Sequence, residues 1–143
     1  MSTHEVALAL TWMISTLSAD ATIQADAPGG VWRAEAPPGT AIPYIAVVFQ
    51  PNNSKDKVVF GGVRAYSDLY FEVFATGPAA SGQTIASAAA RIDDLLTVPR
   101  QTVITNGTLM ASYRTKPIES DVILDGTTWT NMGGEYRIMC KSS

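Results

Sequence analysis

The sequence contains little of the chemistry that enzymes and metal sites require. Its 143 residues include a single cysteine, Cys140, and a single histidine, His4. One cysteine excludes a disulfide within the chain and fits assembly in a reducing compartment. Nucleophilic catalysis normally needs a base beside the nucleophile, and metal sites need clustered His, Cys or carboxylate ligands. We therefore predict no enzyme activity, no catalytic residue, no metal and no cofactor, and we expect Cys140 to be a buried core thiol.

Basic residues are too few and too dispersed to predict a nucleic-acid interface. Ten Lys and Arg oppose thirteen Asp and Glu, and the net charge is -3. Because neutralising phosphates requires a basic face, this composition argues against nucleic acid as a sequence-independent partner. The N-terminal residues before Val6 include no Lys or Arg, and Thr11, Ser15 and Thr16 interrupt the apolar residues that follow. The sequence thus predicts neither a signal peptide nor a membrane span.

Two segments carry the periodicity of amphipathic helices. In the first, apolar residues recur at steps of three and four and form one stripe, made of Val6, Leu10, Met13, Ile14 and Leu17. Ser2 or Thr3 is the expected N-terminal cap of this helix. The second helix is predicted over residues 83–97, where Pro99 ends it, with an apolar stripe of Ile85, Ala88, Ala89, Ile92, Leu95 and Leu96. Residues 19–30 lose the periodicity and are expected to form a loop.

Several strands are predicted before the second helix. Residues 31–36 read as a short strand, and residues 43–50 form an apolar run typical of a strand that is buried on both faces. Residues 68–76 are rich in Tyr, Phe and Val and predict another strand. Residues 51–57 are polar and charged, so we expect a projecting loop there, followed by an extended segment over residues 58–65.

After the second helix, the strongest local signal is a hairpin turn. The pair Asn106-Gly107 is the favoured two-residue turn of a β-hairpin, because both central positions of that turn need a positive φ. Residues 118–132 are expected to form a longer connection that contains a small hairpin at Asp125-Gly126. The strands predicted in this half are residues 102–105, 108–116 and 135–141.

The order of elements predicts a single α+β domain over residues 1–143. We expect an antiparallel or mixed β-sheet with two α-helices packed on one face. The strand at residues 68–76 has apolar side chains of both parities, such as Phe71 against Tyr70 and Phe74. Two explanations stay open: the other sheet face meets a neighbouring subunit, or this strand is simply central in the sheet.

Four stretches of sequence, taken in order, carry a family resemblance. They are VWRAEAPPGT at 31–40, GVR at 62–64 with LYFEV at 69–73, ARIDDLL at 90–96 and GGEYRI at 133–138. In this order and spacing they resemble the tail-terminator or tail-completion (neck) proteins of long-tailed bacteriophages. Together with the N-terminal helix, the resemblance spans nearly the whole chain.

The resemblance implies a structural virion protein with a tail-terminator-like sandwich fold. Members of this family form a ring, typically a hexamer, that caps the tail tube, stops its polymerisation and offers a docking surface to the head connector. The implied partners are other copies of the chain, the tail tube protein and the head-tail connector or neck proteins, with DNA only passing through the lumen and no membrane. The implied location is the neck end of the virion tail, and the host cytoplasm during assembly.

Two charged segments are the candidate contact surfaces if the resemblance holds. We expect Lys55, Asp56, Lys57 and Arg64 to reach a neighbouring subunit or the lumen. We expect the loop with Glu119, Asp121, Asp125 and Trp129 to face the tail tube or the connector. Mobile loops in solvent are the alternative for both segments.

Three other functions stay open from the sequence. The first is another neck component, such as a head-closure or head-tail joining protein. The second is a small binding or adaptor domain with a pocket between its sheet and helices. The third is an enzyme, which would need a titrating group with a perturbed pKa in a cleft.

Overall fold

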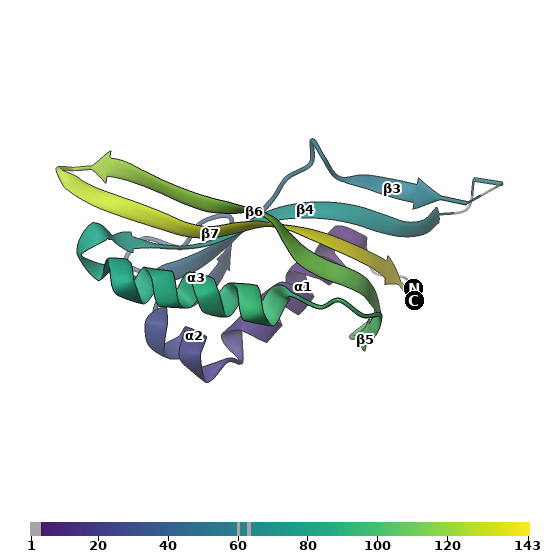
Figure 1. The fold of residues 1–143 in the computed structure, drawn as a ribbon, viewed down its shortest axis with the longest axis horizontal. Helices are drawn as coiled ribbons and strands as arrows, with labels where there is room; N and C mark the ends of the chain where they lie inside the picture. Colours follow the sequence, from purple (N-terminus) through teal and green to yellow (C-terminus); the bar gives the residue numbers. More distant parts are fainter. Residues whose placement is uncertain (1–3, 60, 63) are drawn as a thin grey trace.

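A seven-stranded sheet with helices packed on one of its faces forms the body of the protein (Figure 1). The computed structural model describes residues 4–59, 61–62 and 64–143. The elements in chain order are α1 (Glu5–Ser18), α2 (Ala21–Asp26), β1 (Val31–Arg33), β2 (Tyr44–Phe49), β3 (Lys55–Val58), β4 (Arg64–Pro78), the 3-10 turn η1 (Ala79–Ser81), α3 (Gly82–Leu96), β5 (Thr102–Ile104), β6 (Gly107–Leu124) and β7 (Thr127–Ser142).

The sheet is mixed, as predicted. Its strand order is β1-β2-β4-β7-β6-β5, with β3 paired to β4 off this path. Strands β1 and β2 run parallel, and every other pairing is antiparallel. Along one edge of β4, β2 pairs with residues 71–76 and β3 pairs with its beginning. As a result, β3 and β6 lie on opposite edges of the central β4–β7 pair.

The first helix is confirmed, but its cap is not the expected one. The imidazole Nδ1 of His4 accepts a hydrogen bond from the Val6 N–H at 3.2 Å, and His4 has extended backbone angles, so His4 is the N-cap. Ser2 and Thr3 lie outside the described residues. The predicted stripe turns Leu10, Met13 and Leu17 into the core. Because an isolated helix of this length is marginal in water, this burial is what stabilises it.

The segment at residues 19–30 is not simply a loop, because it contains the short helix α2. The Asp20 carboxylate caps α2 by accepting a hydrogen bond from the Ile23 N–H at 3.1 Å. The same carboxylate receives two hydrogen bonds from Arg91 of α3, at 2.7 and 3.0 Å. A helix of six residues shows too little periodicity to be recognised in the sequence. Arg91, which binds the capping residue Asp20, lies 71 positions further along the chain.

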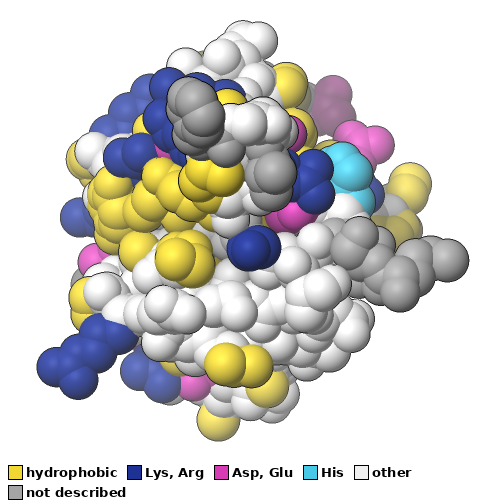
Figure 2. Space-filling view, turned by 90° about the vertical axis from the view of Figure 1, so that its right-hand side faces the viewer, with side chains coloured by type: hydrophobic (Ala, Val, Ile, Leu, Met, Phe, Trp, Pro, Cys, Tyr) yellow, Lys and Arg dark blue, Asp and Glu magenta, His cyan; other side chains and the backbone are white. Residues whose placement is uncertain are grey.

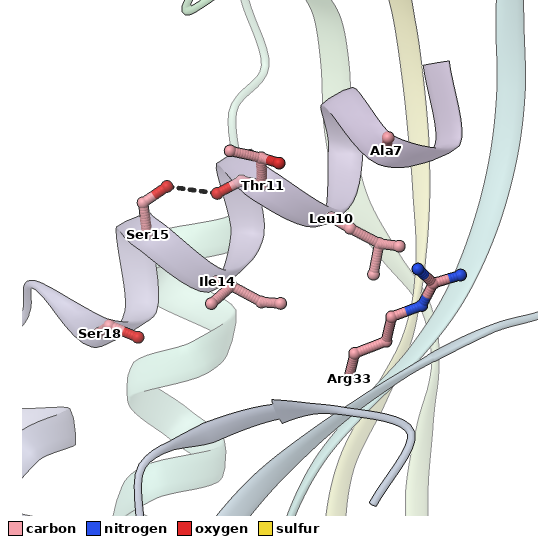
Figure 3. Close-up of a pocket in the computed structure, with 7 residues that line it drawn as sticks. All are labelled: Ala7, Leu10, Thr11, Ile14, Ser15, Ser18 and Arg33. Carbon is pink, nitrogen blue, oxygen red and sulfur yellow. Dashed lines mark hydrogen bonds between the residues drawn. The ribbon is translucent and has the colours of Figure 1, made fainter. Parts of the chain in front are cut away.

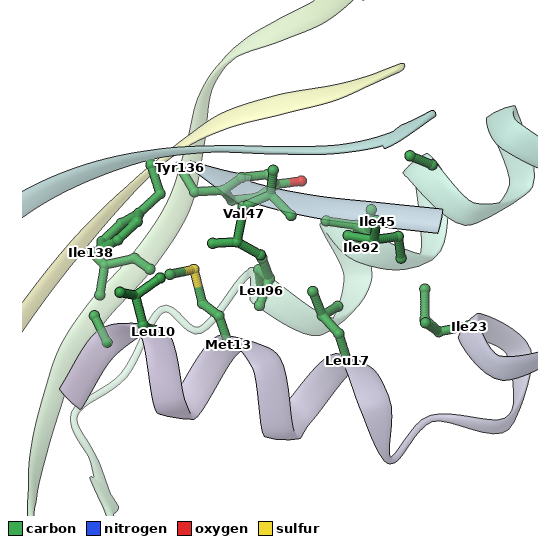
Figure 4. Close-up of a cluster of buried hydrophobic side chains, with 14 of the residues drawn as sticks. Leu10, Met13, Leu17, Ile23, Ile45, Val47, Ile92, Leu96, Tyr136 and Ile138 are labelled. Atoms are coloured by element: carbon green, nitrogen blue, oxygen red, sulfur yellow. The ribbon is translucent and has the colours of Figure 1, made fainter. Parts of the chain in front are cut away.

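Helix α3 is confirmed to within one residue at each end, and it packs with α1 and α2 on the same sheet face. Three helices therefore cover the face where two were expected, because α2 was missed. Figure 4 shows the core that results, in which Met13 and Leu17 from α1 and Ile92 and Leu96 from α3 meet sheet residues such as Val47. Full burial of a side chain of this size contributes about 1.5–3 kcal/mol.

The apolar strand at 43–50 is confirmed as β2. Ile45, Ala46 and Val47 are all buried although successive side chains point to opposite faces, so both faces of β2 are covered. The strand expected at 31–36 ends earlier, at Arg33, because Ala34 takes a left-handed φ of 65°. The strand expected at 68–76 is confirmed within the longer β4.

The polar segment at 51–57 is not a projecting loop throughout, because its second half is part of β3. Lys55 pairs with Asp68, Asp56 with Ser67, and Lys57 with Tyr66. Residues 58–65 are also not one extended segment, since β3 ends at Val58 and β4 begins at Arg64. Charged residues obscured β3 in the sequence, because an edge strand forms through backbone pairing and needs no apolar side chains.

The hairpin at Asn106-Gly107 exists, but its turn is shifted by one residue. Ile104 pairs with Gly107, so the two turn residues are Thr105 and Asn106, and of these only Asn106 has a positive φ, 66°. Gly107 belongs to β6 and is needed for space. A Cβ on Gly107 would lie 2.5 Å from the Lys141 carbonyl oxygen and 2.6 Å from Leu8 Cδ2.

The connection predicted at 118–132 is instead the outer half of a long β-hairpin. Strands β6 and β7 have 18 and 16 residues and pair up to Leu124 and Thr127. The turn is Asp125-Gly126, as predicted, and both residues have positive φ, 50° and 77°. The strands were missed because this segment is exposed on both faces, so its polar residues show no alternation with apolar ones.

Candidate interaction surfaces

The outer part of the β6–β7 hairpin, residues 117–132, forms an arm at one end of the molecule (Figure 1). Its apolar tip is open to solvent, with Val122 44%, Ile123 74% and Leu124 55% exposed. Exposed apolar side chains are common singly, but three consecutive ones next to a turn are typical of a surface that contacts another molecule.

The arm also carries the four residues that the sequence singled out for tube or connector contact. Glu119 and Asp121 lie on the sheet face that bears the helices, whereas Trp129 pairs with Val122 and lies on the opposite face. Asp125 occupies the turn. The structure thus brings these residues to one arm and divides them between its faces. Which partner they contact stays a prediction.

The outer edge of β6 is open over most of its length. Within the described part of the chain, β5 pairs only with residues 107–109 of β6, and Val98 makes an isolated bridge to Ser112. From Tyr113 to Leu124 the edge therefore has no strand partner among the described residues. An edge of this length is a ready template for pairing with another chain, and proteins normally keep such edges short.

The other predicted contact residues, Lys55, Asp56, Lys57 and Arg64, fall into two groups. Two of them bind other residues of the subunit through their side chains, and two do not. Arg64 binds Glu5 at 2.8 Å and lies 4.0 Å from Asp56, and Asp56 accepts a hydrogen bond from the Ser67 hydroxyl at 2.6 Å. Lys55 and Lys57 point to the other face of β3, because they alternate with Asp56. Neither lysine forms an ion pair with any described residue. The two lysines are therefore the members of this set best placed to meet a partner.

An ion pair that sequence reasoning missed lies on the sheet face away from the helices. The Arg137 guanidinium donates two hydrogen bonds to Asp68, at 2.8 and 2.6 Å, and a third to the Tyr113 hydroxyl at 2.9 Å. Asp68 is 1% exposed, and its hydrogen bond raises the pKa of Arg137. The signal in the sequence was one acidic and one basic residue, each beside apolar residues of its strand. The pair joins β4 to β7 at the centre of the sheet.

The predicted core thiol is confirmed. Cys140 is fully buried, and burial together with the nearby Glu5 raises its pKa to about 12. Tyr136, also buried, donates a hydrogen bond to Asp93 at 3.2 Å, and burial raises its pKa as well. Both side chains are protonated and buried in the core, so they are not accessible to a reactant in solution.

A shallow hollow of about 480 Å³ lies between α1 and β1 (Figure 3). It is lined by Ala7, Leu10, Thr11, Ile14, Ser15, Ser18 and Arg33. Arg33 is its only charged group, and the Ser15 hydroxyl is already donated to the Thr11 carbonyl. None of the groups whose pKa is shifted lines it. The hollow therefore lacks the convergent polar groups that orient a small ligand.

No helix in the described part of the chain combines the length and apolar character needed to cross a bilayer. No group of three or more His, Cys, Asp or Glu residues there could hold a metal ion.

Comparison with known proteins yields a likeness of fold. The architecture is shared with a virion protein chain. A chain in the structure of the virion of a native gene transfer agent (GTA) particle superposes with a TM-score of 0.63, over 90% of this chain and 90% of that one, at 20% sequence identity. No protein-family model and no curated protein sequence matches. At this identity the likeness establishes the α+β fold and its mixed sheet.

Proposed function

We propose that the chain is a non-catalytic structural protein of a phage-like virion. The observation that carries this proposal is the shared fold with a chain of the gene transfer agent virion, which extends over 90% of both chains. The likeness therefore extends over most of the domain, which supports a subunit of a virion. The order and spacing of the four sequence stretches described above point to the same class of protein.

The surfaces support a role in assembly over a role in catalysis. The arm exposes three apolar side chains, and the edge of β6 has no strand partner over residues 113–124 of the described chain. In a lone soluble domain such features favour aggregation, whereas in an assembly a neighbour covers them. Tyr136 and Cys140, whose pKa is raised by burial, are core residues, and the raised pKa of Arg137 comes from its ion pair with Asp68.

Within this class, we propose the role of tail terminator. The subunits would form a ring, with six copies as the expected number, that caps the tail tube, stops its growth and presents a surface to the head connector. This finer role rests on the sequence resemblance to tail-terminator proteins. The partners are then other copies of the chain, the tube protein and the connector, at the neck end of the tail.

The function can be tested by complementation of tails. Tails would be assembled in the absence of this protein and then mixed with the purified chain, with buffer as the control, and tube length and joining to filled heads would be scored by electron microscopy. We expect addition during assembly to give tubes of uniform length that join heads. Tubes that are already uniform and lack only head joining would indicate a head-closure or joining protein instead, and tubes unaffected by the chain would refute a neck role.

A further inference from the structure

The two ends of the molecule carry surfaces of opposite character. The arm holds Glu119, Asp121 and Asp125, all exposed, and the sequence has no Lys or Arg between Pro117 and Gly134. The cations nearest along β6 are already used inside the chain, since Arg114 lies 4.0 Å from Asp93 and Lys116 lies 3.7 Å from Glu135. The arm is thus an acidic surface around an apolar tip.

The opposite end of the molecule holds the β3 end, defined as residues 55–59 (Figure 1). It carries Lys55 and Lys57 together with two exposed apolar residues, Val58 at 64% and Val59 at 51%. Figure 2 looks onto this end and shows Lys and Arg side chains gathered around hydrophobic ones. The β3 end is thus a basic surface next to an apolar one.

The lysines of the β3 end and the carboxylates of the arm have no counterion within the described chain. Lys55 and Lys57 form no ion pair there, and neither do Glu119 and Asp125. Asp121 accepts only a neutral hydrogen bond, from the Thr130 hydroxyl at 2.9 Å. Both surfaces also border open strand edges, because β3 pairs only with β4 and the arm edge of β6 has no strand partner in the part described.

We propose that the arm of one copy binds the β3 end of the next copy, head to tail. The inference rests on the ring-forming role proposed above and names the contact that builds the ring. It replaces the tube or connector as the expected partner of the arm. Acidic carboxylates would meet unpaired lysines, and the exposed apolar residues of each end would cover those of the other.

Charge also explains why the contact is head to tail. A contact between two arms would bring carboxylates together, and a contact between two β3 ends would bring lysines together, so both symmetric pairings are disfavoured. A contact between unlike surfaces repeats from copy to copy and closes into a ring when the rotation permits. Because β3 and β6 lie on opposite sides of the central β4–β7 pair, each copy can bind one neighbour through its arm and another through its β3 end.

Two charge-reversal variants test the contact. The arm variant combines Glu119→Lys with Asp121→Lys, and the β3 variant combines Lys55→Glu with Lys57→Glu. The matched control, Glu35→Lys with Asp26→Lys, reverses one exposed and one half-buried carboxylate outside both surfaces. All the altered side chains are at least partly exposed, so circular dichroism should show the native fold for each variant.

The proposal predicts a distinct pattern of assembly. Each variant alone should lose ring assembly, by about tenfold or more at a given concentration, because like charges then face each other. An equimolar mixture of the two should recover assembly with the variants alternating, because the acidic arm of the β3 variant meets the intact lysines of the arm variant, and the reversed arm meets the reversed β3 end. Combining all four substitutions in one chain should restore assembly, and the control should assemble normally. Assembly by either variant alone at the wild-type level would overturn the proposal.

A second measurement reads the contact directly in the wild-type chain. A carbodiimide joins a lysine amine to a carboxylate only where the two touch, and mixing isotopically light and heavy protein identifies links between copies. In rings, whether free or on tube ends, we expect peptides that join Lys55 or Lys57 to Glu119, Asp121 or Asp125. Rings that lack these links would refute the contact and leave the proposed function standing, whereas the absence of any rings, with or without tube ends, would refute both.

Discussion

Removing either partner of the Asp68–Arg137 pair should destabilise the fold, and by unequal amounts. Asp68 is 1% exposed, whereas the Arg137 side chain is 29% exposed. Arg137→Ala therefore leaves a buried carboxylate without its counterion, and we expect a loss of about 3–5 kcal/mol in the free energy of unfolding. Asp68→Ala leaves a guanidinium that water can reach and that still has Tyr113 as a partner, so we expect a smaller loss, about 2 kcal/mol.

The double variant, Asp68→Ala with Arg137→Ala, separates the energy of the interaction from the cost of leaving one charge without its partner. With both side chains replaced by Ala, no charge is left buried, so we expect less destabilisation than for Arg137→Ala alone. The assay is urea unfolding followed by circular dichroism at one fixed protein concentration, because subunit association would also shift the midpoint. Two results would show that burial of the carboxylate does not control the stability of the pair. One is an equal loss in the free energy of unfolding for Asp68→Ala and Arg137→Ala, and the other is a loss in the double variant equal to the sum of the two.

Three further predictions follow from other contacts. Gly107→Ala should lower the free energy of unfolding by about 1–3 kcal/mol, because the new Cβ meets the Lys141 carbonyl and Leu8. Gly39→Ala, which has open space but a φ of 83°, should lower it by only about 1 kcal/mol. Urea unfolding compares the two variants, and equal losses would refute the packing explanation. Cys140 should resist a thiol reagent at pH 8 in the native protein and react only after unfolding, because burial raises its pKa to about 12 and leaves little thiolate; fast native reaction would contradict this. The hydrogen bonds from Arg91 lower the pKa of Asp20 below its ordinary value of 3.8, so the stabilisation from this ion pair is present above that pH and is lost as the pH falls below it. An Asp20→Asn variant should therefore show a flatter curve of stability against pH between about pH 5 and 2, and an unchanged curve would refute the linkage.

The elements that could be predicted from the sequence are those with a buried face. Helices α1 and α3 gave clear patterns because their apolar residues repeat at the helical period, and strand β2 did so because its apolar run is continuous. The burial of Cys140 followed for the same reason. The turn at Asp125-Gly126 was predicted correctly because its positive φ angles restrict the residues that fit.

The elements that were missed depend on distant partners or lack a buried face. Strand β3 is held by backbone pairing to β4, and the arm strands are exposed on both faces, so neither shows the alternation that marks a half-buried strand. Helix α2 is capped by an aspartate that Arg91 of α3 also binds. In these cases the long-range contact supplies the stability, and a local pattern cannot reveal it.

The candidate surfaces were predicted mainly from charged residues in the sequence, and the structure supports only part of that prediction. Lys55 and Lys57 lie exposed or half-buried without an ion pair in the described chain, as an interface residue should, whereas Arg64 and Asp56 serve contacts within the subunit. The sequence could not separate the two groups, because that depends on the alternation of β3 and on Glu5 at the start of α1. The apolar tip at Val122–Leu124 was passed over because the segment was taken for a connection.

The most direct test of the central claim is electron microscopy of the purified chain mixed with tail tubes that were assembled without it. The account predicts closed rings of a single symmetry, either free or bound at one end of each tube. A chain that stays monomeric at all concentrations and never binds a tube end would contradict it.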